Sequence, residues 1–151
     1  RGLSSRSGLS CLSGQLTGQT RQTRTMKLTR FEDLECWKEA RQLTRLVYEA
    51  IGQGSQWQKD LRLCGQLQGA SVSVMANIAE GFVRHSDKEF VQFLFVAMAS
   101  AAEVQSHLYV AVDQGHLAPE KFDSMYVQAE KTGRIISGLI KYLRRTTKST
   151  K

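Results

Sequence analysis

Apolar residues recur at intervals of three and four along most of the chain, and no stretch alternates as a β-strand would. The pattern predicts four helices, over about residues 31–51, 57–82, 86–114 and 119–143. Gly52 and Gly54 end the first helix, and Pro119 begins the fourth. Ser86 and Glu89 have the spacing of a capping box ahead of the third. Because the intervening loops are short, we expect an all-α fold, an up-down-up-down antiparallel four-helix bundle.

The third predicted helix has an unusual surface, because the thirteen residues from Phe90 to Ala102 carry no charge. The helix is apolar nearly all round, which is typical of an element buried on more than one side. We infer self-association into a homo-oligomer; the alternative is a central helix covered by its neighbours and the N-terminal tail. The interface candidates are Phe93, Phe95 and Met98. The uncharged run spans about 20 Å, too short for a bilayer, and neither a membrane span nor a secretion signal is predicted.

Polar side chains interrupt the apolar seams of the second and third helices. We expect these side chains to face each other across the antiparallel pair: Ser73, Asn77 and Glu80 on the second helix, and Ser100, Glu103 and His107 on the third. A buried polar group without a partner costs about 1–3 kcal/mol, so such residues need one another. They indicate either a functional site or a structural polar network that fixes helix register, and the structural network of Ser73, Asn77, Glu80 and Glu103 is the preferred interpretation.

Charge is distributed unevenly along the chain, whose formal net charge is +7. Residues 1–25 contain four Arg and no acid, and residues 131–151 contain seven basic residues and no acid. We predict a flexible basic tail over residues 1–25, the bundle over residues 26–146 and a basic C-terminal tail over residues 147–151. The leader has the composition of a transit peptide, although it lacks an amphipathic helix. A start at Met26, or a tail added to the natural protein, is the alternative.

The predicted topology brings both basic ends of the chain to one pole of the bundle. We therefore expect a positive surface that binds RNA, DNA or an RNA–DNA hybrid through the phosphate backbone, with little reading of sequence. The candidate nucleic-acid-binding residues are Lys27, Arg30, Arg84, Lys88, Arg134, Lys141, Arg144, Arg145 and Lys148. Tyr142, which lies between Lys141 and Arg144, is the one aromatic residue in this region that could stack on a base. The alternative is that the basic C-terminal turn only complements the helix dipole and keeps the protein soluble.

Catalytic and metal-binding patterns are missing from the sequence. A di-iron bundle needs about four carboxylates and two histidines, whereas Glu103 and His107 form the only Glu-to-His helical pair in the predicted core. Cys11, Cys36 and Cys64 lack Cys-x-x-Cys spacing, which suits a reducing cytoplasm. There is no phosphate-binding glycine loop or nucleophile elbow. We predict a cytoplasmic protein that is not an enzyme and has no metal or cofactor, and we expect His85 and His116 to face solvent.

Three short runs of residues, taken in their order along the chain, resemble a known protein family. Phe31-Glu32-Asp33-Leu34 with Trp37, then Asn77-Ile78-Ala79-Glu80-Gly81, then Lys88-Glu89-Phe90, occur in the order and spacing of the four-helix bundle proteins of intervening sequences in bacterial 23S ribosomal RNA genes. The resemblance covers about residues 31–143. One departure from the family is the 25-residue leader. The others are Cys64-Gly65 and Gly69 in the second predicted helix, at positions where the family more often has basic residues.

The same family is similar to the accessory variability protein of diversity-generating retroelements, a basic bundle that forms a pentameric ring. The resemblance implies a homopentameric, non-catalytic accessory protein that binds nucleic acid and works with a reverse transcriptase and its template RNA. It leaves open whether this retroelement setting or the ribosomal RNA setting applies. The competing hypothesis is a homo-oligomeric protein-interaction scaffold without nucleic-acid function.

Overall fold

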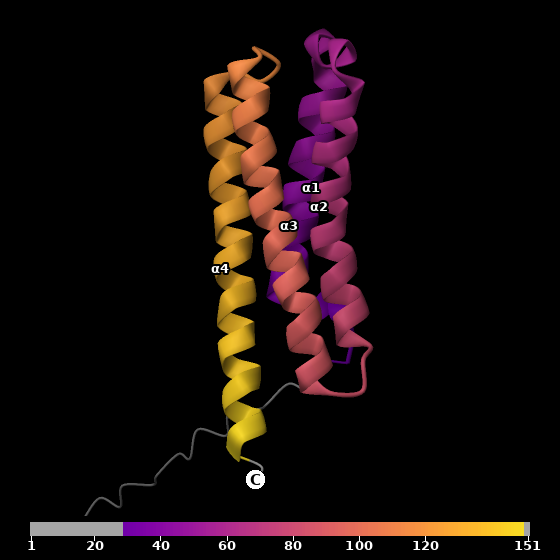
Figure 1. Cartoon of the computed structure of the whole chain (residues 1–151), viewed down its shortest axis with the longest axis vertical. Coiled ribbons are helices and arrows are strands. Elements are labelled where there is room, and N and C mark those ends of the chain that lie inside the picture. The colour runs from indigo at the N-terminus through magenta and orange to yellow at the C-terminus, as the bar shows by residue number, and fades with distance from the viewer. Residues whose placement is uncertain (1–28, 150–151) are drawn as a thin grey trace, which may run out of the picture.

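Four long helices and two short 3₁₀ helices make up the described part of the chain. The computed structural model describes residues 29–149, with side chains for residues 29–146. Its elements are η1 (Phe31–Asp33), α1 (Glu35–Gln53), η2 (Ser55–Lys59), α2 (Leu61–Phe82), α3 (Asp87–Asp113) and α4 (Pro119–Ser149). Within the described range there is no strand, and the predicted all-α helical bundle is confirmed. Consecutive helices run in opposite directions, and α1 and α3 run in the same direction (Figure 1).

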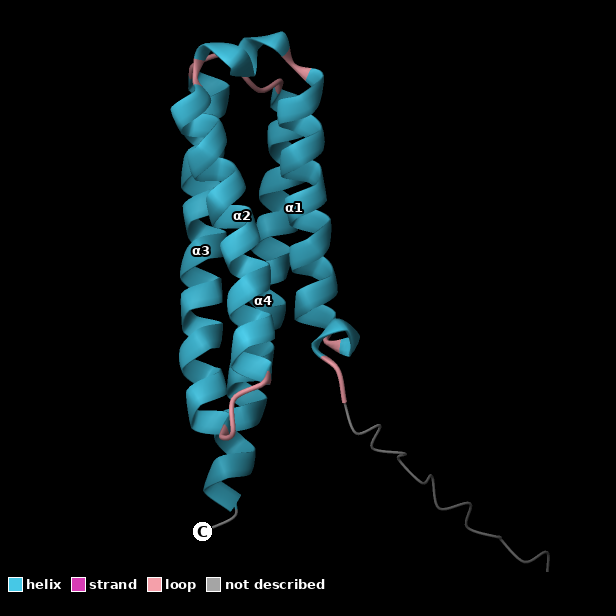
Figure 2. Ribbon diagram, turned by 90° about the vertical axis from the view of Figure 1, so that its right-hand side faces the viewer, coloured by secondary structure: helices cyan, strands magenta, loops and turns pink. Residues whose placement is uncertain are grey.

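The helices pack in a four-cornered arrangement. Helices α1 and α3 each contact both α2 and α4. The turn between α2 and α3 and the end of α4 lie at one end of the bundle, which we call the lower pole (Figure 1). The opposite end, the upper pole, carries η2 and the α3–α4 turn, as the rotated view in Figure 2 also shows. The basic ends of the sequence therefore belong to the lower pole as far as they are described.

Several helix boundaries differ from those predicted. The first helix is divided at Leu34, whose extended backbone separates η1 from α1. Trp57, expected in the second α-helix, lies in η2. Helix α2 begins later because the Asp60 carboxylate accepts a hydrogen bond from the Leu63 N–H at 2.9 Å, an N-cap that the periodicity did not reveal. Helix α4 runs to Ser149, three residues past the boundary drawn at 146, and the proposed tail of residues 1–25 lies outside the described residues.

The turns at the two poles follow from local chemistry. Ser86 caps α3, because its Oγ accepts a hydrogen bond from the Glu89 N–H at 3.3 Å. The hydroxyl in turn donates to the Glu89 carboxylate at 2.8 Å, so the expected Ser–Glu pair forms, although the carboxylate binds the hydroxyl instead of the Ser86 N–H. At the upper pole Gly115 has φ of +70°, which a residue with a side chain rarely adopts, and it turns the chain from α3 toward α4.

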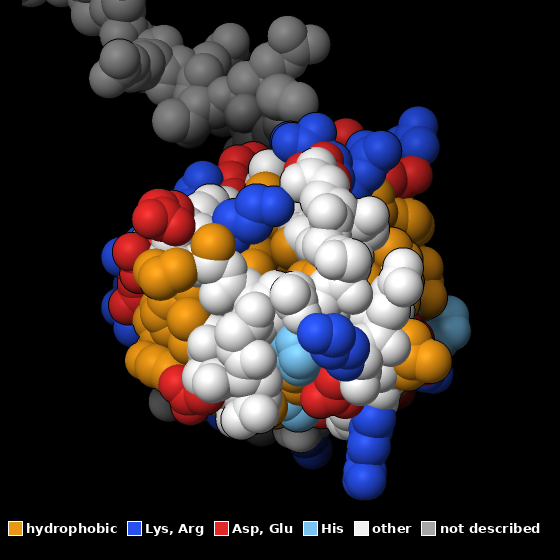
Figure 3. Space-filling view, turned by 90° about the horizontal axis from the view of Figure 1, so that it is seen from above, with side chains coloured by type: hydrophobic (Ala, Val, Ile, Leu, Met, Phe, Trp, Pro, Cys, Tyr) orange, Lys and Arg blue, Asp and Glu red, His pale blue; other side chains and the backbone are white. Residues whose placement is uncertain are grey.

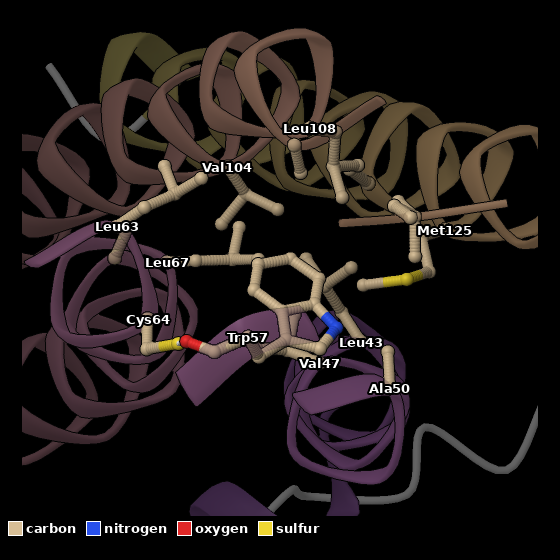
Figure 4. Close-up of a cluster of buried hydrophobic side chains, with 14 residues drawn as sticks. Leu43, Val47, Ala50, Trp57, Leu63, Cys64, Leu67, Val104, Leu108 and Met125 are labelled. Atoms are coloured by element: carbon tan, nitrogen blue, oxygen red, sulfur yellow. Dashed lines mark hydrogen bonds between the residues drawn. The ribbon is translucent and has the colours of Figure 1, made fainter. Parts of the chain in front are cut away.

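The core consists of two apolar clusters stacked along the bundle. The upper one is built around Trp57, whose side chain is 2% exposed and packs among Leu43, Leu67, Leu108 and Met125 (Figure 4). The lower cluster joins residues of all four helices, listed from α1 to α4 as Cys36, Ala40, Val74, Ile78, Leu94, Ala97, Ile136 and Ile140. Burial of these side chains is the main force that holds the helices together.

Hydroxyl groups mark the level between the two clusters. Thr132 and Ser71 are fully buried, and each donates to a carbonyl of its own helix, at Gln128 and Gln68. Thr44 donates to the Ser71 carbonyl at 3.0 Å and so joins α1 to α2. A buried polar group that has found its partner favours one helix register over others.

Helix α3 is long and apolar enough, by length and composition, to cross a membrane, which the thirteen-residue uncharged run did not suggest. It is the one helix of the described residues that meets this criterion. Core helices of water-soluble bundles meet it as well, and α3 packs along α2 and α4. Seen from the upper pole, apolar side chains reach the surface on more than one side of the bundle (Figure 3).

Candidate nucleic-acid interface

The C-terminal half of α4 carries a row of basic side chains. Arg134, Lys141 and Arg145 follow one another at intervals of seven and four residues, which places them on one face of the helix, and all three are exposed. Between the first two lies Gly138, where an added Cβ would meet nothing within 4 Å. We call these three residues the α4 stripe; it extends over about 16 Å at 1.5 Å per residue.

No ion pair within the described residues neutralises the charges of the α4 stripe. Among the described side chains, none of the three basic groups has a carboxylate within 4 Å. No acidic residue occurs in the sequence after Glu130. By contrast Lys131, one residue later, is bound to Glu39 on α1 at 2.8 Å. The stripe therefore presents uncompensated positive charge to solvent, which is the arrangement that attracts polyanions.

Two further arginines of the lower pole rest on aromatic rings of α3. The guanidinium carbon of Arg144 lies 5.0 Å from the ring centre of Phe95, and that of Arg84 lies 4.7 Å from the ring centre of Phe93. Such cation–π contacts orient the guanidinium group without cancelling its charge. Tyr142 is 60% exposed next to Lys141, so its ring is accessible to a base.

The remaining predicted binding residues are less favourably placed. Arg30 is bound to Glu32 at 2.6 Å, and Arg84 is also bound to Glu80, so the charges of both are compensated within the chain. Lys88 is exposed, next to Asp87 and Glu89 in the first turn of α3. Lys27 lies outside the described residues, and the side chain of Lys148 is likewise not described. Among the described members of the predicted set, those without an ion pair are Lys88 and four residues of α4: Arg134, Lys141, Arg144 and Arg145.

The predicted polar network forms only in part. Ser73 Oγ and Ser100 Oγ lie 3.0 Å apart across the α2–α3 pair. The Asn77 side-chain amide donates to both the carbonyl and the hydroxyl of Ser73, at 2.8 and 3.1 Å. Because these contacts join one helix to the next and Ser100 is only 7% exposed, they support the structural interpretation of Ser73, Asn77 and Ser100.

Glu80 and Glu103 do not belong to this network, contrary to prediction. Glu80 is exposed near the end of α2 and binds Arg84, one helical turn further on. Glu103 is exposed and contacts His107 on its own helix at 3.4 Å. Both carboxylates keep their charge in contact with water, which avoids the cost of burying it.

The α3 residues proposed as interface candidates are half-buried. Phe95 and Met98 pack against the lower core cluster. The Phe93 ring lies under Arg84, and its Cβ is close to Gly81 of α2. The α3 side chains that are exposed lie on another face of the helix and include Val96 at 49% and Val110 at 42%.

The surroundings of the buried cysteines, Cys36 and Cys64, suit a packing role. Burial raises the pKa of the Cys36 thiol to about 11 and also raises the pKa of Cys64, so both thiols stay protonated at neutral pH and are poor nucleophiles. The Cys64 thiol also donates to the Trp57 carbonyl at 3.2 Å (Figure 4). No group of three or more His, Cys, Asp and Glu residues in the described chain is arranged to hold a metal ion.

His116 corrects another expectation, since its side chain is only 10% exposed. The imidazole packs on the Trp57 ring with centres 5.7 Å apart, and Nε2 lies 3.9 Å from Asp60. His116 therefore ties the α3–α4 turn to η2 and to the start of α2. His85, in contrast, is exposed as expected.

Comparison with known proteins agrees with this fold. The sequence profile of the 23S rRNA-intervening sequence protein family matches residues 32–138. No curated protein sequence matches the chain. A crystal structure of a protein of unknown function from the S23 ribosomal protein family of Bacteroides thetaiotaomicron superposes with a TM-score of 0.63 at 19% sequence identity, covering 70% of this chain and 98% of that one. The profile match extends over most of the described bundle, and the chain belongs to the 23S rRNA-intervening sequence protein family.

Proposed function

We propose that this protein is a non-catalytic RNA-binding accessory protein that holds the phosphate backbone along the α4 stripe. The observation that carries the proposal is the uncompensated charge of Arg134, Lys141 and Arg145 on a helix segment without acidic residues. A row of cations on one helix face neutralises phosphates in succession and releases their counterions.

The form of the site favours backbone contact over base recognition. Only Tyr142 among the neighbouring residues offers an exposed aromatic ring, whereas single-strand binders that stack bases use several. Phosphate contacts position a protein on nucleic acid without reading its sequence. The family name, which refers to an intervening sequence of ribosomal RNA, supports RNA as the polyanion.

The finer parts of the proposal rest on the family resemblance. We infer a homo-oligomer of five chains that assists a nucleic-acid enzyme such as a reverse transcriptase. A ring of subunits with the same orientation brings their α4 stripes to one side and so increases the local positive potential. A protein-interaction scaffold without affinity for RNA is the competing function.

Charge reversal on one pole tests the proposal. The variant carrying Lys141→Glu and Arg145→Glu should lose retention of a structured RNA in a gel-shift assay at low salt. The control carries Lys59→Glu and Arg62→Glu, which reverse two exposed charges of the upper pole. Both variants have the same net charge, so loss of retention in the first alone supports the α4 stripe. Equal retention by the two variants would remove the stripe from the function, and absence of binding by the parent protein would favour the scaffold.

A further inference from the structure

A large open groove runs along the outer side of α1 and α2, away from the α4 stripe. Its volume is about 1240 Å³, which exceeds the roughly 300–1,000 Å³ of ordinary small-molecule sites. Small and apolar side chains of α2 form its floor: Val72, Met75, Ala76 and Ala79. Trp37 and Tyr48 of α1 line its wall. Val72 is 44% exposed and Tyr48 is 49% exposed, so much of this apolar surface is in contact with water.

Basic residues of α1 border the groove. Lys38, Arg41 and Arg45 all line it, and Glu32 is the single acidic residue of the lining. Lys38 and Arg45 also contact Glu35 and Glu49 in exposed ion pairs of 3.6 and 3.5 Å. Arg41 has no carboxylate within 4 Å among the described side chains, and its guanidinium carbon lies 5.9 Å from the ring centre of Trp37. The groove is therefore apolar with a basic edge.

The outer face of α3 has the complementary character. One row of exposed residues follows intervals of four and three along the helix, in the order Gln92, Val96, Ala99, Glu103, Ser106 and Val110. We call this row the α3 ridge. It is mostly small or apolar, and its one charge is acidic. Val96 and Val110 are 49% and 42% exposed, although the helix lies between two neighbours. Exposed apolar side chains that follow one another on a helix face offer a surface on which a partner can pack.

We propose that the α3 ridge of one copy of this chain seats in the α1–α2 groove of a second copy. Side chains spaced three and four residues apart form a ridge on one face of a helix, and such a ridge can pack into the groove between two other helices. Small residues on both surfaces permit close approach of the backbones, and Glu103 then faces the basic edge at Arg41. The acidic ridge and the basic groove edge are therefore electrostatically complementary, whereas packing one groove against another would bring like charges together.

The direction of the helices fits a repeated contact of this kind. Because α1 and α3 run in the same direction (Figure 1), a rotation about an axis parallel to the bundle sets the ridge of one copy alongside α1 of the next. The ridge and the groove are different surfaces, so the contact is heterologous, and each copy still offers one free ridge and one free groove. Such contacts close into a ring when the rotation divides a full turn.

This inference specifies the surfaces of the homo-oligomer in the proposed function and does not depend on RNA binding. It replaces Phe93, Phe95 and Met98 as the contact residues, since those side chains are already half-buried within their own bundle. The row of side chains that faces outward from α3 takes their place.

A charge-swap experiment on the full chain tests the contact. Glu103→Arg and Arg41→Glu are prepared as separate single variants, and their native masses are measured without RNA over a concentration series. Each variant alone should associate at least about tenfold more weakly than the parent, because like charges meet at the interface. An equimolar mixture should regain most of the association, because the altered ridge of the first variant then meets the altered groove of the second with opposite charge, while the two unaltered surfaces also pair. In a ring of five, one contact would still join two copies of the same variant, so the mixture should associate more strongly than either variant alone and less strongly than the parent. A monomeric parent, or an association that neither change weakens, would overturn the inference.

A second variant tests the groove without changing charge. Ala76→Trp places a large ring on the exposed floor of α2 and should reduce the native mass to that of a monomer, whereas a mass equal to the parent's would also overturn the inference. Circular dichroism verifies the helical fold of every variant. RNA retention measured on the same samples separates the two proposals: a dissociated variant that still retains RNA supports both, and an associated parent that retains none refutes only RNA binding.

Discussion

Neutralising the α4 stripe should change the salt dependence of RNA binding by a calculable amount. The variant replaces Arg134, Lys141 and Arg145 with Gln, which removes three charges that no carboxylate of the described chain compensates. The logarithm of the affinity falls as the logarithm of the salt concentration rises, and each lost phosphate contact makes this slope shallower by about 0.7 for a single strand and about 0.9 for a duplex. The magnitude of the slope should therefore be smaller by about 2 to 3 in the variant. Between about 50 and 200 mM salt, the parent should lose roughly 20- to 40-fold more affinity than the variant.

Fluorescence anisotropy with a labelled structured RNA measures these affinities over a salt series. The matched control replaces Lys59, Arg62 and Lys121 with Gln, which removes the same charge from the upper pole. The control should keep nearly the parental slope, because binding through the stripe does not involve those residues. If both variants reduce the slope equally, binding responds to net charge and the reasoning from the stripe is refuted.

Three further predictions concern the bundle itself. Gly81→Ala should destabilise the bundle by about 1–3 kcal/mol, because an added Cβ would lie 2.7 Å from Phe93 Cβ. The control Gly69→Ala lies in open space and should stabilise the bundle by about 1 kcal/mol. Equal urea midpoints for the two variants would contradict this prediction. Thr44→Val should cost about 1 kcal/mol through the lost hydrogen bond between α1 and α2, and an unchanged midpoint would show that the bond contributes nothing. Hydrogen bonds from Lys131 and Gln128 lower the pKa of Glu39. The resulting stability is present above the ordinary pKa of Glu and lost as the pH falls through the lowered value. Glu39→Gln should therefore lie below the parent at pH 7 in chemical denaturation and approach it in acid; a constant difference would contradict the assignment.

The helices were predictable because their signals are local. The 3.6-residue period of the apolar positions determined the number and order of the helices, and Ser86 with Glu89 marked the start of α3 correctly. The boundary at Trp57 was wrong, because η2 and α2 follow each other with only Asp60 between them and both bury apolar residues. Helical periodicity does not distinguish a 3₁₀ turn from the α-helix beside it.

The polar network shows where periodicity becomes insufficient. Ser73 and Asn77 are four residues apart on the α2 face that meets α3, so their partnership with Ser100 follows from spacing. Glu103 lies three residues beyond Ser100, which rotates it away from α2 and onto the outer ridge. The same spacing arguments placed Glu80 inward, but the end of a helix is open to solvent and Arg84 is one turn away.

Contacts between distant segments could not be read from the sequence. His116 is buried by packing against Trp57, which lies 59 residues earlier, so the local pattern around a histidine in a turn pointed wrongly to solvent. The α1–α2 groove depends on the separation of two helices and on the small residues that α2 places between them. Free charge was likewise overestimated at Arg30 and Arg84, because each has an acidic partner close in sequence.

If RNA lies along the C-terminal half of α4 as proposed, photo-crosslinking should locate it there. The full chain is mixed with a structured RNA at low salt, irradiated and digested, and the peptides that carry nucleotide adducts are identified by mass spectrometry. Adducts should concentrate in residues 134–146, with Tyr142 as the preferred aromatic site because its ring is 60% exposed beside the stripe. Adducts confined to the upper pole or to the α1–α2 groove, or none at all under conditions in which the RNA is retained, would contradict the proposal.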